Sequence, residues 1–150
     1  MLPRPPPRST QPVKLKFAHL ADYAGADASG KLTIVGLFGV VFDALKVRPI
    51  PFPKFHIVAQ FEAKVTEGTD HRVQVQLIDQ QKRNVLQKFE GAIRLAPSGR
   101  GEPLQANLLL GFGPGLTVPD LGTYEFRFLI DGKDVGGLPI SVLEPQPPPE

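Results

Sequence analysis

Apolar and polar side chains alternate along much of the chain, and the period of two predicts strands. Residues 54–63, KFHIVAQFEA, are an example in which every second side chain is apolar. One side of this segment carries Phe55, Ile57, Ala59, Phe61 and Ala63, and the other carries Lys54, His56, Val58, Gln60 and Glu62. The alternation therefore predicts a half-buried strand with its first side turned to a core.

Other segments repeat this period. Val73, Val75 and Leu77 are expected to point inward from a second strand, and residues 65–71, VTEGTDH, have the length of a hairpin turn. Val85, Phe89, Ile93 and Leu95 lie on one side of a further segment. The additional strands are predicted at residues 13–21, 31–45, 72–79, 85–95, 104–112, 123–130 and 138–143, with a bulge or bend near Gly36 and Gly39.

No window of a dozen residues has the apolar spacing of an amphipathic helix. About eight or nine strands at roughly ten-residue spacing predict an all-β fold, an antiparallel β-sandwich. Residues 120–126, DLGTYEF, resemble the tyrosine corner of immunoglobulin-like sandwiches, with Tyr124 two residues before the core position Phe126. The partner cysteine and core tryptophan of antibody domains are missing, so the fold is immunoglobulin-like in outline only.

Composition divides the chain into three parts. Residues 1–12 contain five prolines and residues 145–150 contain four, which favours extended tails on either side of a single domain at residues 13–144.

The apolar runs are too short to span a bilayer, and no secretory signal is visible, so we expect a cytoplasmic protein. Cysteine is absent, which excludes disulfides and thiolate chemistry.

The basic residues are concentrated at the start of the chain. Arg4, Arg8, Lys14 and Lys16 precede the first acidic residue, Asp22, while the formal net charge of the whole chain is only +2. A broad nucleic-acid-binding face is not indicated, and a weak nucleic-acid binder acting through this arm is an alternative. The sequence PRPPPR at residues 3–8 is either a solubilising tail or a ligand for an aromatic groove.

Residues 25–32, GADASGKL, almost match the phosphate-binding loop G-x-x-x-x-G-K-[ST]. Gly25, Gly30 and Lys31 are in register, but Leu32 replaces the hydroxyl residue that binds magnesium. The following residues are β-branched and interrupted by glycine, whereas a phosphate-binding loop opens a helix. We favour a type I turn with Asp27 first and Gly30 fourth, and a nucleotide-binding protein or enzyme is the alternative.

Residues 22–38 read DYAGADASGKLTIVGLF. This segment resembles an uncharacterised family of bacterial domains of unknown function, in which it reads approximately D-Y-A-x-x-D-x-x-G-K-L-x-x-x-G-[IL]-F. The resemblance implies an all-β domain and no known activity. Gly39 stands where that family commonly has an aspartate after the phenylalanine. The matching residues are Asp22, Tyr23, Ala24, Asp27, Gly30, Lys31, Leu32, Gly36, Leu37 and Phe38.

Few residues suggest catalysis. His19, His56 and His71 lie on three predicted elements without metal-ligand spacing, and no serine lies in a nucleophile motif, so we expect no catalytic residue, metal or cofactor. The sequence favours a non-catalytic module that binds a protein partner or associates with itself, and it leaves any small-molecule ligand open. The candidate partner-contact residues in loops are Asp27, Gly30, Lys31, Arg100 and Phe112.

Overall fold

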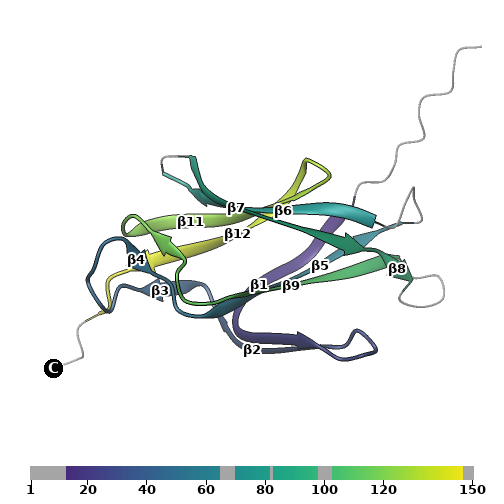
Figure 1. The fold of residues 1–150 in the computed structure, drawn as a ribbon, viewed down its shortest axis with the longest axis horizontal. Helices are drawn as coiled ribbons and strands as arrows, with labels where there is room; N and C mark the ends of the chain where they lie inside the picture. The colour runs from purple at the N-terminus through teal and green to yellow at the C-terminus, as the bar shows by residue number, and fades with distance from the viewer. Residues whose placement is uncertain (1–12, 65–69, 82, 98–102, 147–150) are drawn as a thin grey trace, which may run out of the picture.

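The computed structural model describes residues 13–64, 70–81, 83–97 and 103–146, and within these ranges every regular element is a strand. Two five-stranded sheets pack face to face (Figure 1). The first sheet has the order β2-β1-β5-β9-β8, and the second has the order β3-β12-β11-β6-β7. The strands are β1 (Lys14–Ala26), β2 (Leu32–Phe38), β3 (Val40–Phe42), β4 (Ile50–Pro51), β5 (Phe55–Ala63), β6 (Asp70–Asp79), β7 (Asn84–Arg94), β8 (Ala96–Pro97), β9 (Leu104–Phe112), β10 (Thr117–Val118), β11 (Gly122–Ile130) and β12 (Lys133–Leu143).

The predicted alternation forms the core between the two sheets. All five apolar side chains predicted to point inward from β5 are buried, and so are Val73, Val75 and Leu77 of β6. The ring of Phe55 stacks on Phe112 with centroids 4.7 Å apart, which joins the ends of β5 and β9. Burial of one such side chain stabilises the fold by about 1.5–3 kcal/mol relative to exposure. The all-β sandwich predicted from the sequence is confirmed.

Three features of the strand connections differ from the predictions. Residues 31–45 form two strands separated at Gly39, and β4, β8 and β10 are two-residue strands, too short for a periodic signal. The sandwich is not wholly antiparallel, because β3 runs parallel to β12. The link at residues 65–71 does not close a hairpin, because β5 and β6 belong to different sheets; its residues 65–69 are outside the described part of the chain.

The inward orientation predicted for Val85 of β7 is wrong. The pairing of β6 with β7 shifts register between Leu77 and Ile78, as a β-bulge does. The shift turns Val85 outward, where it is 44% exposed, and Leu86 packs against the core in its place. Phe89 and Ile93 keep their predicted inward orientation.

The tyrosine corner predicted at the start of the penultimate strand is present. Tyr124 is buried on β11, and its hydroxyl donates a 2.6 Å hydrogen bond to the backbone carbonyl of Asp120. The backbone N–H of Asp120 lies 3.4 Å from the same hydroxyl oxygen. Desolvation by burial raises the pKa of Tyr124, so the phenol stays protonated and remains a donor. This contact gives the sandwich its immunoglobulin-like corner.

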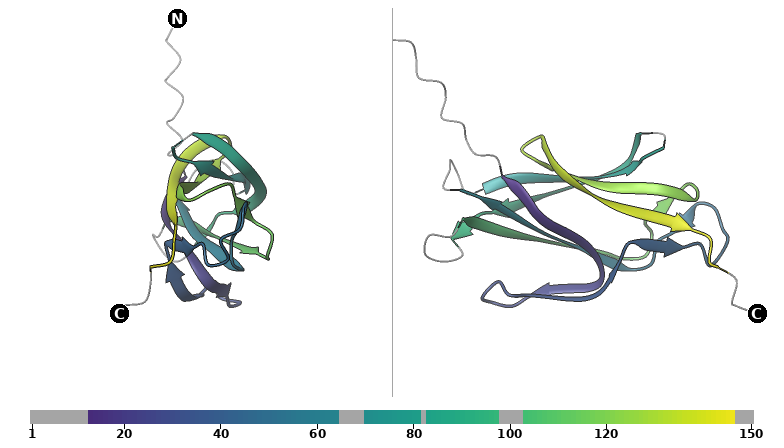
Figure 2. Two further views of the ribbon diagram at one scale, coloured as in Figure 1. Left: turned by 90° about the vertical axis from the view of Figure 1, so that its left-hand side faces the viewer. Right: turned by 180° about the vertical axis from the view of Figure 1, so that it is seen from behind.

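The β1–β2 hairpin forms a third layer outside the first sheet. β1 pairs with β5 only as far as Ala21, and its remaining residues pair with β2 alone. Figure 2 shows this hairpin lying below the sandwich. Val58 of β5 points away from the core, yet it is fully buried, as is Ala24 of the hairpin. The amide of Asn107 on β9 donates a 3.2 Å hydrogen bond to the carbonyl of Gly30, which ties the hairpin turn to the sheet.

Candidate functional site

The turn of the β1–β2 hairpin is built by the side chain of Asp27. Its Oδ1 accepts hydrogen bonds from the backbone N–H groups of Ser29 and Lys31, both at 2.9 Å, and from the Ser29 hydroxyl at 2.6 Å. These bonds, the Ser29 hydroxyl first, lower the pKa of the Asp27 carboxyl. The N–H of Gly30 donates to the Asp27 carbonyl at 3.0 Å, and Gly30 has a φ of 84°. This is the predicted turn.

The geometry of a phosphate-binding loop is not found in this segment. The residues after Lys31 form strand β2, whereas the nucleotide alternative requires a helix there. The Asp27 carboxylate occupies the backbone N–H groups that would otherwise face a phosphate. The chain therefore uses its glycines and aspartate to close a hairpin.

The structure brings three of the five predicted contact residues together. Asp27, Gly30 and Lys31 are exposed at the hairpin turn. Phe112 is the last residue of β9, and its half-buried ring packs against Phe55 and against Phe89, the latter with centroids 4.9 Å apart. Arg100 lies outside the described residues. A role of any of them in partner contact stays a prediction.

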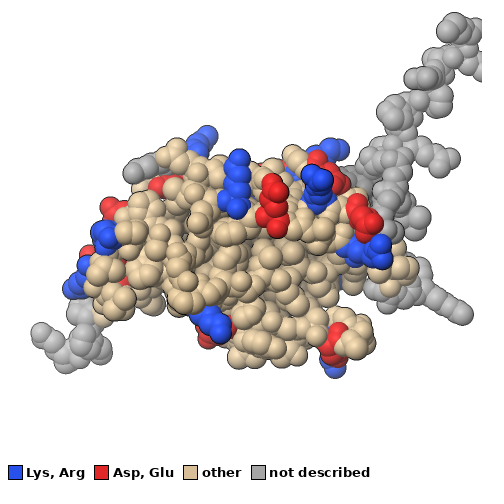
Figure 3. Space-filling model, in the orientation of Figure 1, with Lys and Arg blue, Asp and Glu red and all other residues tan. Residues whose placement is uncertain are grey.

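The outer face of the hairpin exposes large apolar side chains that were not among the predicted contact residues. Tyr23 and Val35 are each 53% exposed and are direct partners across β1 and β2, and Leu37 is 61% exposed on the same face. We call these three residues the hairpin face. Figure 3 shows that the lower part of the molecule, where the hairpin lies, carries few charged side chains. The signal available in the sequence was LTIVGLF, a strand without a charge.

The edge strands of the two sheets differ in how they are protected. β8 has two residues and contains Pro97, and β3 has three residues. β7 is long, but it carries Lys88, Glu90 and Arg94. Short strands, prolines and charges are the usual means of blocking pairing with another chain. β2 has seven residues and none of these protections within the strand.

A bend at Asp22 separates the hairpin from the rest of the first sheet. Gly36 lies opposite Asp22 with a φ of 73°, and a Cβ at Gly36 would collide with the Asp22 carboxyl group. The carbonyl of Asp22 lies 3.3 Å from Nδ1 of His56, and the ring of His56 meets Tyr23 edge-on with centroids 5.5 Å apart. Glycine at position 36 is thus favoured by its backbone conformation, and any other residue would also displace the Asp22 carboxyl group.

An apolar groove with a volume of about 520 Å³ lies beside this bend. Its walls include Phe38 of β2, Phe42 of β3 and Phe52 before β5. Most of the large apolar side chains that are exposed in the described part of the chain belong either to the hairpin face or to this region. Those near the groove are Val40, Phe42, Leu45, Val47 and Leu143.

Charged groups hold one wall of the groove in place. Asp43 is buried, and it accepts a 2.8 Å bond from Nη1 of Arg48 and a 3.0 Å bond from the backbone N–H of Lys46. Arg48 also reaches Asp120 at 3.2 Å, beside the tyrosine corner. The hydrogen bond to Asp43 is the main reason that the pKa of Arg48 is raised. The loop between β3 and β4 is therefore anchored to the segment that precedes β11.

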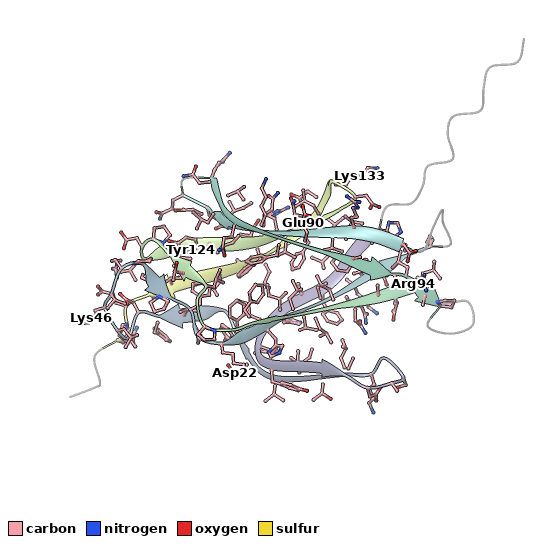
Figure 4. The ribbon with its side chains drawn as sticks, viewed as in Figure 1. Asp22, Lys46, Glu90, Arg94, Tyr124 and Lys133 are labelled. Atoms are coloured by element: carbon pink, nitrogen blue, oxygen red, sulfur yellow. The ribbon has the colours of Figure 1, made fainter. Side chains whose placement is uncertain are left out.

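The polar clusters at the other end of the sandwich join strands to one another. Nδ1 of His71 lies 2.6 Å from the Asp131 carboxylate, and this bond is the main cause of the lowered pKa of Asp131. Arg127 donates two hydrogen bonds to Asp134 and one to Glu125 on the outer face of the second sheet. Figure 4 shows Glu90 and Lys133 on the side of the second sheet and Asp22 on the side of the hairpin.

Metal-binding groups do not gather in the described part of the chain. No set of three or more histidine, aspartate or glutamate side chains is placed there to hold a metal ion. His71 lies at the opposite end of the sandwich from His56, since one pairs with Asp131 and the other with the bend at Asp22. Among the same residues, no helix is long and apolar enough to cross a membrane.

The fold and the tyrosine corner define the class of this protein as an immunoglobulin-like β-sandwich with an added hairpin layer. Residues 16–143 match the model of a family of unknown function (DUF6941), and the chain belongs to that family. The match covers almost the whole sandwich, which agrees with the uncharacterised domain family expected from the sequence. Comparison with curated proteins finds none that matches.

Proposed function

We propose that this protein is a non-catalytic assembly module that associates with a second copy of itself through the edge of β2. The observation that carries the proposal is the combination of an unprotected seven-residue edge strand with the exposed hairpin face. A strand edge offers unpaired backbone N–H and C=O groups, and a second strand satisfies them.

A second copy suits this edge because β2 contains no charge. In a two-fold dimer each copy presents the same strand, so any charged residue near the axis would face its own kind. β2 running antiparallel to its copy brings Val35 and Leu37 of both chains onto one face, where they shield each other from water. Lys31 precedes the strand, so an antiparallel arrangement places the two lysines at opposite ends of the pair.

Light scattering coupled to size-exclusion chromatography tests the proposal. The wild-type protein is expected to have twice the 16.3 kDa mass of one chain. Val35→Lys adds a charge to an exposed position and is expected to give a monomer without unfolding the chain. Val85→Lys is the matched control, because Val85 is a 44% exposed valine on the edge strand β7. A monomeric wild type at high concentration, or a Val35→Lys protein that is still dimeric when residues 1–12 are also removed, contradicts the proposal.

Bacterial origin and a cytoplasmic location stay predictions from the sequence. The test of self-association needs neither, because it measures only the mass of the purified protein. The non-catalytic part of the proposal is supported by the use of the described polar clusters in turns and strand pairing.

A further inference from the structure

The groove beside the bend combines aromatic walls with an available carboxylate. Phe38, Phe42 and Phe52 line it, and Leu45, which is 70% exposed, lies at its rim. Asp22 also lines the groove and, within the described residues, forms no side-chain hydrogen bond or ion pair, whereas Asp43 is fully engaged by Arg48. Aromatic walls with an acidic residue are the surface that a proline-rich, basic peptide requires.

We propose that this groove binds the proline-rich, arginine-containing segment PRPPPR, residues 3–8, of a second copy of the chain. A polyproline II helix has little conformational entropy to lose on binding, and its rings pack flat on aromatic side chains. An arginine beside the prolines pairs with a carboxylate such as Asp22. This contact is separate from the β2 edge and does not depend on it.

Charge favours this segment over the other proline-rich part of the chain. Residues 145–150, PQPPPE, follow Glu144 and carry acidic but no basic side chains. They begin next to the groove, since Leu143 pairs with Phe42. Two carboxylates that approach each other repel, so an acidic segment at Asp22 is disfavoured although it is nearby. Arg4 and Arg8 give the first segment the complementary charge.

Chain length favours binding between copies. β1 begins at Lys14 and reaches the groove at Asp22, eight residues later, a span of about 26 Å at roughly 3.3 Å per residue. Figures 1 and 2 show the start of β1 and the end of β12 at opposite ends of the sandwich. Arg8 precedes Lys14 by six residues, which cover about 19 Å in a polyproline II helix. The backbone of Arg8 therefore falls short of Asp22 of its own copy by about 7 Å, whereas a second copy can place the whole of PRPPPR in the groove.

Fluorescence anisotropy with a labelled peptide of residues 1–12, titrated with the full-length protein, tests this inference. Saturable binding is expected, and a peptide carrying Arg4→Glu and Arg8→Glu is expected to bind at least tenfold more weakly. A peptide of residues 144–150 is expected to show no saturation. Binding that does not saturate, or equal affinity for the altered or acidic peptide, overturns the assignment of the occupant.

Variants of the protein locate the site. Phe42→Ser and Asp22→Asn are each expected to weaken binding of the arm peptide at least tenfold, and Val85→Ser, outside the groove, is expected to leave it unchanged. Phe42 is 53% exposed, so its loss should preserve the fold, which thermal unfolding checks. If that variant is unfolded, Leu45→Ser at the rim replaces it. Unchanged affinity in the folded groove variants overturns the inference. The Val35→Lys protein should bind the peptide as the wild type does, because the arm contact does not involve β2.

Discussion

The tyrosine corner provides a direct test of how the second sheet is held, through the variant Tyr124→Phe. The substitution removes one oxygen from a side chain that is only 2% exposed, without changing its apolar packing. The 2.6 Å bond to the Asp120 carbonyl is lost, and so is the acceptor for the Asp120 N–H. Because Asp120 itself is exposed, the loss is that of one net hydrogen bond, about 0.5–1.5 kcal/mol. We therefore expect the free energy of unfolding to fall by about 1 kcal/mol.

Urea unfolding followed by circular dichroism measures this loss. The midpoint should fall while the slope of the transition stays constant, since the surface exposed on unfolding does not change. In thermal unfolding, a loss of about 1 kcal/mol corresponds to a shift of about 2–4 °C for a chain of this size. Tyr23→Phe is the matched control, because Tyr23 is the other tyrosine and is 53% exposed. Its stability should stay within about 0.5 kcal/mol of the wild type.

A Tyr124→Phe protein as stable as the Tyr23→Phe control would refute the reasoning. That result would mean that the hydroxyl group contributes no net stability, and the corner would have to be held by packing and by the ion pair of Arg48 with Asp120. The pH dependence of the free energy of unfolding at high pH gives a second check. The pKa of Tyr124 is raised by burial, so its contribution is present below the normal tyrosine range and is lost as the pH rises through the folded-state pKa.

Two further predictions concern the ends of the β1–β2 and β11–β12 hairpins. The lowered pKa of Asp131 means that its bond to His71 stabilises the fold above the unfolded-state pKa and that this stability is lost as the pH falls through the folded-state pKa. The urea midpoint of Asp131→Asn should therefore lie below that of the wild type at pH 7 and equal it in strong acid. A difference in midpoint that stays constant with pH contradicts this. Gly36→Ala places a Cβ against the Asp22 carboxyl group and holds an alanine at a φ of 73°. Amide hydrogen exchange in β2 should therefore become faster while β11 stays protected. Unchanged exchange in β2 contradicts this prediction.

The regular strands could be predicted because their side chains alternate between a core and a polar face. β9 has the predicted bounds, and β5 starts one residue later than predicted. β12 begins at Lys133, several residues before the prediction, because Gly136 and Gly137 hide the strand pattern there. The outward orientation of Val85 was not predicted, because the bulge between Val85 and Gln87 inverts the alternation of side chains on one side of it relative to the other.

Longer-range arrangement could not be predicted from local patterns. The parallel pairing of β3 with β12 joins residues a hundred positions apart, and no periodicity encodes that choice. The sequence held one sign of a further layer, namely Val58 on the polar side of an otherwise alternating strand. Val58 is fully buried in the structure, and this exception could have indicated that another element covers this face.

The candidate site was predicted in part, since the turn residues Asp27 and Gly30 were identified but the surface beside them was not. Sequence motifs draw attention to glycines and charges, whereas a contact surface of this kind consists of the residues that lack them. LTIVGLF reads as an ordinary buried strand until the sheet order shows that β2 is an edge. The exposure of Val35 and Leu37 is a property of that position in the fold and is not a property of the segment.

The bend at Asp22 and Gly36 explains why the two proposed contact surfaces occur together. β1 pairs with β5 only as far as Ala21, and in the hairpin beyond this point Ala24 is buried while Tyr23, Val35 and Leu37 are exposed. The same bend places Asp22 and Phe38 beside β3, where they form one side of the groove. The bend at Asp22 and Gly36 thus lies between the exposed edge strand β2 and the aromatic groove.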